Sequence, residues 1–298
     1  MNTCDCHHKT DVRFSDYYSE NILTWCTNCG NYGIQAAIKR ALVAENIPPC
    51  RTLLCFDVGC HGNGADKIGG YRFHGIHGRV LAFACGASVA NRKIKVIAFG
   101  GDGGTLGEGI NHLVSAIRGN YDITFVLHNN LNYGLTTGQA SATTKSGIKM
   151  NSSPDGVTSD PIHVMNFVFS LNPSFVARTF SGDVKHMSGI FQESIKHNGF
   201  SFIEVLQSCP SYNHMTPHQW YQSRVKDVTQ MSGYNFRDIK AARQAAEDLE
   251  VQIAIGVLYQ NSKSVPFMQR QANRLKVSGD LVDEVKVFPT EKLFDTFR

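Results

Sequence analysis

The sequence has no long apolar run. No stretch reaches the roughly 18 consecutive apolar residues that a helix needs to cross a membrane, and the polar start MNTCDCHHKT lacks the apolar core of a signal peptide. We therefore predict a cytoplasmic protein without a membrane segment.

Strongly basic segments are also missing. Lys and Arg together number 29 and Asp and Glu 25, which leaves a formal net charge of +4. No basic run is interleaved with aromatic residues, so the composition argues against a nucleic-acid partner. With 42% hydrophobic and 18% charged residues among 298, the chain is expected to fold as one large globular domain, alone or with an appendage.

Two common phosphate-binding loops are absent too. A Walker A loop needs Gly-Lys-Ser/Thr, and a dinucleotide-binding fingerprint that starts at Gly101 needs Gly or Ala where Leu106 stands. What the chain has is an apolar run at 96–101, a glycine-rich turn around Asp102, and the apolar periodicity of a helix at 110–117. Such a turn before a helix is an anion site, most naturally for a phosphate.

Asp102 and Asn130 end two successive apolar runs. Each is therefore predicted at the carboxyl end of a parallel strand, where open α/β sheets bind ligands. An aspartate inside the turn repels a phosphate unless a cation lies between them, and these oxygen ligands suit Mg²⁺. The alternative is an ordinary glycine turn followed by a turn-forming Asn pair.

The nine cysteines are an odd number, so they cannot all pair in disulfides, which favours an intracellular protein. Cys26 and Cys29 form a Cys-x-x-Cys that is ambiguous between zinc, a redox dithiol and half of an iron–sulfur site. Cys60 and Cys209 are each predicted at a strand end, so these four cysteines are expected to converge on one edge of the sheet.

The remaining pattern predicts a mostly parallel α/β sheet with helices on both faces. Strands are predicted at 52–58, 96–101, 123–130, 174–180, 200–206 and 252–259, helices at 34–42, 80–90, 110–117, 161–172, 183–197 and 239–249, and a turn at 73–78. Residues 131–160 are predicted to be a long, functional loop.

We divide the chain into three parts: a flexible N-terminal tail (1–20), an α/β domain (21–215) and a C-terminal extension (216–298). The tail carries Cys4, Cys6, His7 and His8. These residues form either a small metal site or, as their polar surroundings favour, part of the flexible segment.

The sequence GDG at 101–103, followed by Asn130 28 positions after Asp102, resembles the thiamine diphosphate and Mg²⁺ motif. The run NNLNYGLTTGQASATT, together with WCTNCGN, VGCHG, HGIHGR and SCPSYN, is similar to the β subunit of the 2-oxoacid:ferredoxin oxidoreductases. The resemblance covers residues from about 20 to 215 and implies the thiamine diphosphate-binding fold.

This resemblance implies three sets of site residues. The side chains of Asp102 and Asn130 and the main-chain carbonyl of Asn132 would hold Mg²⁺. The cofactor would be contacted by Gly103, Gly104, Gly134 and Leu135 at its diphosphate and by Val58, Gly59, Cys60, His61 and His77 elsewhere. A 4Fe-4S cluster would be bound by Cys26, Cys29, Cys60 and Cys209.

The implied activity is the CoA-dependent oxidative decarboxylation of a 2-oxoacid, pyruvate or 2-oxoglutarate, with electrons passed through the cluster to ferredoxin. In this family the glutamate that activates the cofactor lies on the pyrimidine-binding domain of another subunit. We therefore expect an α-type partner, in a heterodimer or heterotetramer, and name no catalytic acid or base in this chain. Gly104 departs from the common GDGD and Thr137 from a lysine found in some members, and both positions concern the cofactor or substrate.

Two alternatives belong to other classes. One is a non-oxidative thiamine diphosphate decarboxylase or ligase component, which needs no cluster and so leaves the four cysteines without a role. The other is a zinc-stabilised binding module with an incidental glycine turn.

Overall fold

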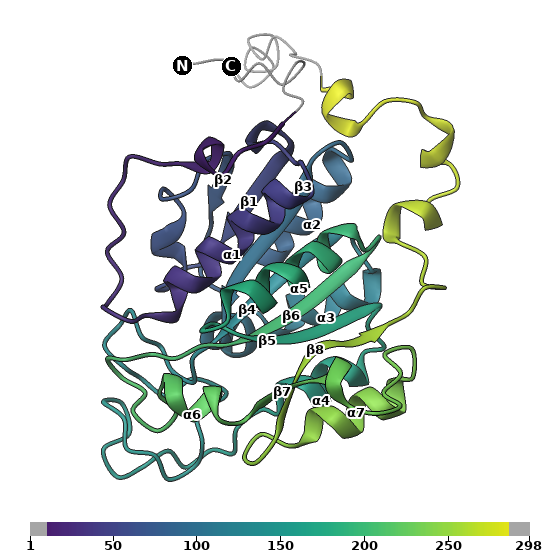
Figure 1. Ribbon diagram of the computed structural model, residues 1–298. Helices are drawn as coiled ribbons and strands as arrows, with labels where there is room; N and C mark the ends of the chain where they lie inside the picture. Colours follow the sequence, from purple (N-terminus) through teal and green to yellow (C-terminus); the bar gives the residue numbers. More distant parts are fainter. Residues whose placement is uncertain (1–10, 286–298) are drawn as a thin grey trace, which may run out of the picture.

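The computed structural model describes residues 11–285, and at its centre lies an eight-stranded sheet with the order β2-β1-β3-β4-β6-β5-β8-β7 (Figure 1). The strands are β1 (Thr52–Phe56), β2 (Tyr71–His74), β3 (Lys95–Gly101), β4 (Ile123–Asn129), β5 (Phe175–Phe180), β6 (Phe200–Leu206), β7 (Val225–Asp227) and β8 (Ile253–Gln260). Neighbouring strands from β2 to β5 are parallel, whereas β8 runs antiparallel to β5. The predicted mostly parallel sheet is confirmed.

Helices cover both faces of this sheet (Figure 1). They are α1 (Gly30–Ala44), α2 (Val80–Ala90), α3 (Ile110–Gly119), α4 (Val164–Ser170), α5 (Val184–Lys196), α6 (His218–Gln222) and α7 (Ile239–Glu247). On one face α1 and α5 pack together, and Ile38 and Phe191 share a core with Val126. On the other face Leu113 and Phe125 belong to a second core with α2, α4 and α7. Phe125 and Val126 point to opposite faces because side chains alternate along a strand.

The predicted elements all occur, with shifted ends, and two short strands were missed. Residues 73–78 were predicted to be a turn, but Tyr71–His74 forms the edge strand β2. Its residues are exposed or half-buried, so the alternating apolar pattern that identifies a strand is absent. The other missed strand, β7, has three residues. The predicted long loop is confirmed. The structure describes every residue from the end of β4 to the start of α4, and this segment contains neither a helix nor a strand.

The three-part division of the chain stays a prediction, although the structure adds two facts about it. Val12 and Tyr17, within the predicted tail, are buried, and the Tyr17 hydroxyl donates to the Ile47 carbonyl at 2.7 Å. Residues 12–17 are thus packed on the domain. At the other end, β7 and β8 join the main sheet.

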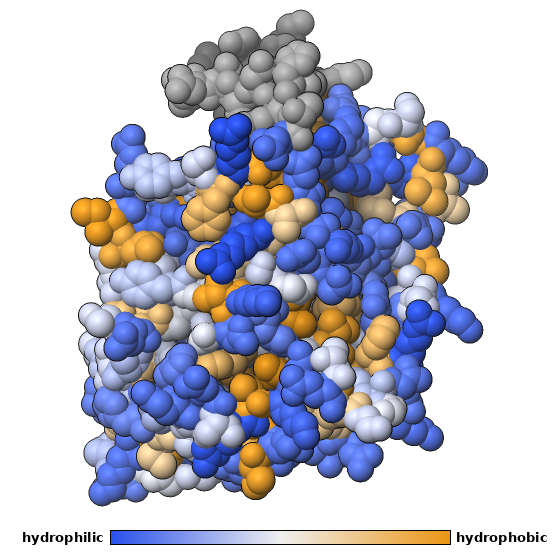
Figure 2. Space-filling model, viewed as in Figure 1, coloured by the Kyte–Doolittle hydropathy of each residue, from blue (hydrophilic) through white to orange (hydrophobic). Residues whose placement is uncertain are grey.

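On the face seen in Figure 2, hydrophobic residues form small patches separated by hydrophilic ones.

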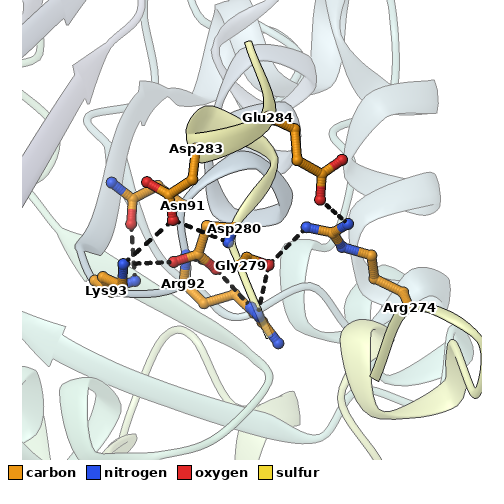
Figure 3. Close-up of polar contacts among 8 residues, drawn as sticks. All are labelled: Asn91, Arg92, Lys93, Arg274, Gly279, Asp280, Asp283 and Glu284. Atoms are coloured by element: carbon orange, nitrogen blue, oxygen red, sulfur yellow. Dashed lines mark hydrogen bonds and ion pairs between the residues drawn. The ribbon is translucent and has the colours of Figure 1, made fainter. Parts of the chain in front are cut away.

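After β8 the chain returns along the molecule as an arm, residues 261–285, to the turn between α2 and β3 (Figure 1). Arg92 Nε donates to Asp280 Oδ1 at 2.7 Å, and Lys93 Nζ lies 3.6 Å from Asp280 Oδ2 and 3.4 Å from Asp283 Oδ2 (Figure 3). The Asp280 side chain is 3% exposed. The hydrogen bond from Arg92 lowers the pKa of Asp280. Within the arm, Arg274 pairs with Glu284.

Replacing Asp280 with alanine is expected to loosen the end of this arm. Arg92 and Lys93 lose their shared partner, so local opening of residues 274–284 should become about tenfold more frequent, the effect of one charge-assisted hydrogen bond. Hydrogen–deuterium exchange measures this directly. Lys263→Ala, at an exposed position earlier in the arm, is the control. Equal protection of residues 274–284 in both variants would show that Asp280 does not anchor the arm.

Candidate functional site

The carboxyl ends of four neighbouring strands, β1, β3, β4 and β6, meet at one edge of the sheet. The turns that follow them begin at Asp57, Asp102, Asn130 and Gln207. This is the edge at which open α/β sheets bind ligands. The predicted placement of Asp102 and Asn130 at adjacent parallel strand ends is therefore observed.

Asp102 is 1% exposed, and two side-chain hydroxyls contact the same oxygen of its carboxylate. Oδ2 accepts hydrogen bonds from Ser141 Oγ at 2.5 Å and Thr143 Oγ1 at 2.6 Å. Burial raises the pKa of Asp102 to about 6 despite these donors. Both donors come from the long loop after β4, and sequence reasoning missed them because Ser and Thr in a loop carry no distinctive pattern. A nearby cation would stabilise this buried carboxylate.

The turn after β4 is fixed by its own amides. Asn132 N donates to Asn130 Oδ1 at 3.1 Å, and Asn132 Nδ2 donates to the Asn130 carbonyl at 2.8 Å. Asn213 Nδ2 donates to the same carbonyl at 3.1 Å. A Cβ at Gly134 would lie 3.2 Å from Asn132 Oδ1 and 3.3 Å from Cys60 Sγ. Gly134 therefore lets the predicted Mg²⁺ turn and the predicted cluster ligand Cys60 approach each other closely.

The glycine-rich turn after Asp102 is crowded by side chains from other loops. A Cβ at Gly103 would lie 2.7 Å from Cδ1 of the Tyr133 ring, and one at Gly104 would lie 2.7 Å from His77 Cε1 and overlap the Asp57 carboxylate. Glycine is needed here for this close approach. The turn continues as a π-helical segment, Gly104–Glu108, before α3 begins.

His61 lies beneath this turn rather than at the surface. Its ring would be 3.1 Å from a Cβ at Gly101, and it lies 5.2 Å from the ring of His128. Burial holds the pKa of His61 well below its usual value and lowers the pKa of His128 to about 3, so both rings are neutral. In the same loop Gly59 has φ +146°, while Leu135, across the site, is 48% exposed.

Four free cysteines gather at the same edge. Gln207 Nε2 lies 3.8 Å from Cys29 Sγ, and Ser211 Oγ lies 3.0 Å from Cys26 Sγ. Burial raises the pKa of Cys60 to about 12, and negative charge on Cys29, Cys209 and Cys26 raises it further. A cavity of about 700 Å³ borders Cys29 and Cys209. These thiols are thus within electrostatic reach of one another.

Other cysteines lie elsewhere. Cys55 is buried in β1, Cys85 lies on α2, and Cys50 is disulfide-bonded. Cys4, Cys6, His7 and His8 fall outside the described residues. Within residues 11–285, no three His, Cys, Asp or Glu side chains lie close enough together to hold a single metal ion.

In the same part of the chain, no helix is long and apolar enough to span a bilayer.

The residues present fit the groups that the sequence implies. Asp102 and the Asn130 turn offer carboxylate, amide and carbonyl oxygens, the ligands that Mg²⁺ prefers. The glycine turn has no side chains of its own between its backbone and a ligand, and its backbone precedes a helix, as anion sites do. Four thiols within electrostatic reach of one another match the ligand set of a 4Fe-4S cluster.

A buried ion pair inside the sheet, which the sequence did not predict, connects to the residues at this edge. Arg178 Nε on β5 donates to Glu204 Oε2 on β6 at 2.7 Å, and Asn129 Nδ2 donates to Glu204 Oε1 at 2.8 Å. The side chains of Arg178 and Glu204 are 1% and 3% exposed. Asn129 Oδ1 lies 3.1 Å from Thr143 Oγ1, which also reaches Asp102. The pair therefore connects the sheet interior to the donors around Asp102.

Replacing Glu204 with alanine is expected to destabilise the protein by about 3–5 kcal/mol, because Arg178 is left as an uncompensated buried charge. Denaturant unfolding followed by circular dichroism measures the change. Glu193→Ala removes a carboxylate whose side chain is 55% exposed on α5, so a change below about 0.5 kcal/mol is expected there. Equal midpoints for the two variants would contradict the desolvated ion pair.

The fold and the site together define a thiamine diphosphate-binding α/β domain. The family model described as thiamine pyrophosphate enzyme, C-terminal TPP binding domain, matches residues 57–205. The model for the C terminal of the pyruvate ferredoxin oxidoreductase beta subunit matches residues 209–276. The first range contains Asp102, Asn130 and three of the four strand-end turns. The second range contains Cys209.

Relatives narrow the class further. The chain is 37% identical to the 2-oxoacid:ferredoxin oxidoreductase subunit beta of Saccharolobus solfataricus, over 84% of this chain and 86% of that one. It is 33% identical to the 2-oxoglutarate synthase subunit KorB of Archaeoglobus fulgidus, over 69% and 78%. The solved 2-oxoglutarate:ferredoxin oxidoreductase of Magnetococcus marinus, with 2-oxoglutarate, coenzyme A and succinyl-CoA bound, superimposes with a TM-score of 0.86 at 26% identity, covering 98% of each chain. The chain belongs to the β subunits of the 2-oxoacid:ferredoxin oxidoreductases and is an oxidoreductase subunit.

Proposed function

We propose that this β subunit, with an α-type partner, catalyses the CoA-dependent oxidative decarboxylation of pyruvate or 2-oxoglutarate and delivers the electrons through a 4Fe-4S cluster to ferredoxin. The observation that carries the proposal is the position of the buried Asp102 carboxylate at the sheet edge where four cysteines gather. The KorB relatives and the bound ligands of the Magnetococcus enzyme support 2-oxoglutarate as the substrate.

Each set of residues has a role in this proposal. Asp102, the Asn130 side chain and the Asn132 carbonyl hold Mg²⁺. Gly103, Gly104, Gly134 and Leu135 surround the diphosphate, and His77 and residues 58–61 contact the rest of the cofactor. Cys26, Cys29, Cys60 and Cys209 hold the cluster.

Thiamine diphosphate, when bound, supplies a nucleophilic carbon and takes up the electrons left after loss of CO₂. This chain orients the cofactor. It also excludes water from the Asp102 carboxylate, because the Asp102 side chain is 1% exposed. Residues 58–61 bring the cofactor contacts and the cluster ligand Cys60 into one short loop. The activating glutamate is expected on the partner, so no acid or base is assigned here.

Exposed apolar side chains support the requirement for an α-type partner. Ile76, Leu135 and Met215 are 78%, 48% and 62% exposed, and they lie in the same loops as His77, Gly134 and Asn213. Large apolar side chains at the rim of a site are typical of an interface. We propose that this rim is covered by the α-type partner and that the complex is cytoplasmic.

The test is anaerobic co-purification with the partner. The complex should be brown, with absorbance near about 400 nm from cysteine-ligated iron–sulfur sites, and should reduce a viologen dye only when CoA and a 2-oxoacid are present. A panel of 2-oxoacids identifies the substrate. A colourless zinc protein would refute the proposal, and decarboxylation without dye reduction would favour a non-oxidative thiamine diphosphate enzyme.

A further inference from the structure

Asp57, directly after β1, is a fully buried carboxylate with one unused oxygen. Its Oδ1 accepts hydrogen bonds from the backbone nitrogens of Val58 and Gly78, both at 2.8 Å. Its Oδ2 is buried without a hydrogen-bond partner, and burial raises the pKa of Asp57. A buried acceptor without a donor is costly. Asp57 Oδ2 is therefore available to accept a hydrogen bond from a group other than the backbone.

His77 supplies the matching unsatisfied donor. Its Nδ1 is buried, lacks a hydrogen-bond partner and lies 3.5 Å from Asp57 Oδ1. Its Nε2 lies on the other side of the ring, 3.8 Å from Glu108 Oε2. His77 Nδ1 therefore faces the Asp57 carboxylate, on the side of the oxygen that already accepts the two backbone hydrogen bonds.

Both groups lie directly over the glycine turn. A Cβ at Gly104 would be 2.9 Å from His77 Nδ1 and would overlap Asp57 Oδ2. The nearby Arg79 is directed elsewhere, since its Nη1 lies 3.5 Å from the Glu108 carbonyl oxygen and 2.9 Å from His112 Nε2. His77 is thus the side chain over Gly104 that can donate a hydrogen bond to an anion bound there.

We infer that Asp57 is a positioning residue for His77, which it holds over Gly104 so that the imidazole contacts the diphosphate of the cofactor. Nδ1 faces Asp57, and Nε2, on the opposite side of the ring, is the nitrogen that contacts a phosphate oxygen. A carboxylate that orients an imidazole in this way fixes its tautomer and direction. The inference rests on the proposed function, which places the diphosphate at Gly103 and Gly104.

A double-mutant cycle on the assembled complex tests this inference. The variants are Asp57→Asn, His77→Gln and the two combined, and the dissociation constant of thiamine diphosphate is measured by calorimetry with saturating Mg²⁺. Each single substitution is expected to raise the constant about tenfold, the effect of one charge-assisted hydrogen bond. Because Asp57 acts through His77, the combined variant should bind no more weakly than His77→Gln.

Additive losses, or an unchanged constant in Asp57→Asn, would overturn the inference. Asp66→Asn, an exposed residue in the loop after β1, is the control and should leave the constant unchanged. If Asp57→Asn does not assemble, Gly104→Ala replaces it, since the added methyl displaces the same pair; unchanged binding in that variant would also overturn the inference. A wild-type complex that binds no thiamine diphosphate would instead refute the proposed function.

Discussion

Replacing Asp102 with alanine is expected to weaken Mg²⁺-dependent binding of thiamine diphosphate to the assembled complex by more than about 100-fold. Loss of an outer-shell partner of a metal ligand typically weakens binding 10–100-fold, and Asp102 is proposed as a direct ligand. It is also the one charged member of the proposed ligand set, because Asn130 and Asn132 contribute neutral oxygens. Calorimetry with the cofactor and Mg²⁺ measures the loss.

Two comparisons make this result specific. Thr143→Val removes one hydrogen bond to Asp102 Oδ2 at 2.6 Å while leaving the carboxylate in place, so a loss of about tenfold is expected. The iron–sulfur absorbance of Asp102→Ala should equal that of the wild type, which shows that the sheet edge is intact. Unchanged cofactor affinity in Asp102→Ala would refute the placement of the metal.

Replacing Cys209 with alanine is expected to remove the proposed 4Fe-4S cluster. Cys209 is 8% exposed and follows β6, and residues 207–217 contain no other cysteine that could replace it. Bound iron should fall to near zero, the absorbance near about 400 nm should disappear, and dye reduction should be lost. Iron analysis and electron paramagnetic resonance of the anaerobically purified complex measure the effect.

The matched control for this prediction is Cys85→Ala. Cys85 is also a free cysteine, but it lies on α2 in the opposite core and away from the four gathered thiols. Its loss should leave iron content and dye reduction unchanged. A brown, active Cys209→Ala complex would show that the cluster has a different ligand set.

The sheet was predictable because its central strands are buried on both faces and read as short apolar runs. β4 and β6 are buried at every residue, which places Asn130 and Cys209 at strand ends without any knowledge of the contacts. The edge strand β2 has no such pattern, since three of its four residues are exposed and Phe73 is only half-buried.

The side chains that support the site were harder to predict. Ser141 and Thr143 reach Asp102 from 39 and 41 residues away, and nothing in a loop rich in Ser and Thr distinguishes the two that do so. Arg178 and Glu204 look like ordinary strand residues until two parallel strands bring them together. Asp57 could have been identified from its position, because an acidic residue directly after the apolar run 53–56 is unusual unless it binds a polar group.

The gathered cysteines also restrict the order in which the protein matures. Ser211 contacts Cys26 across 185 residues, and Gln207 contacts Cys29 across 178. Contacts between such distant segments form late in folding, because the entropy of closing a long loop must be overcome first. The thiols become neighbours only when β6 has paired with β4 and α1 has docked on the sheet. The proposed cluster would therefore be inserted into a chain that has already folded, and iron bound earlier by the Cys26–Cys29 pair alone would be an off-pathway product of biogenesis.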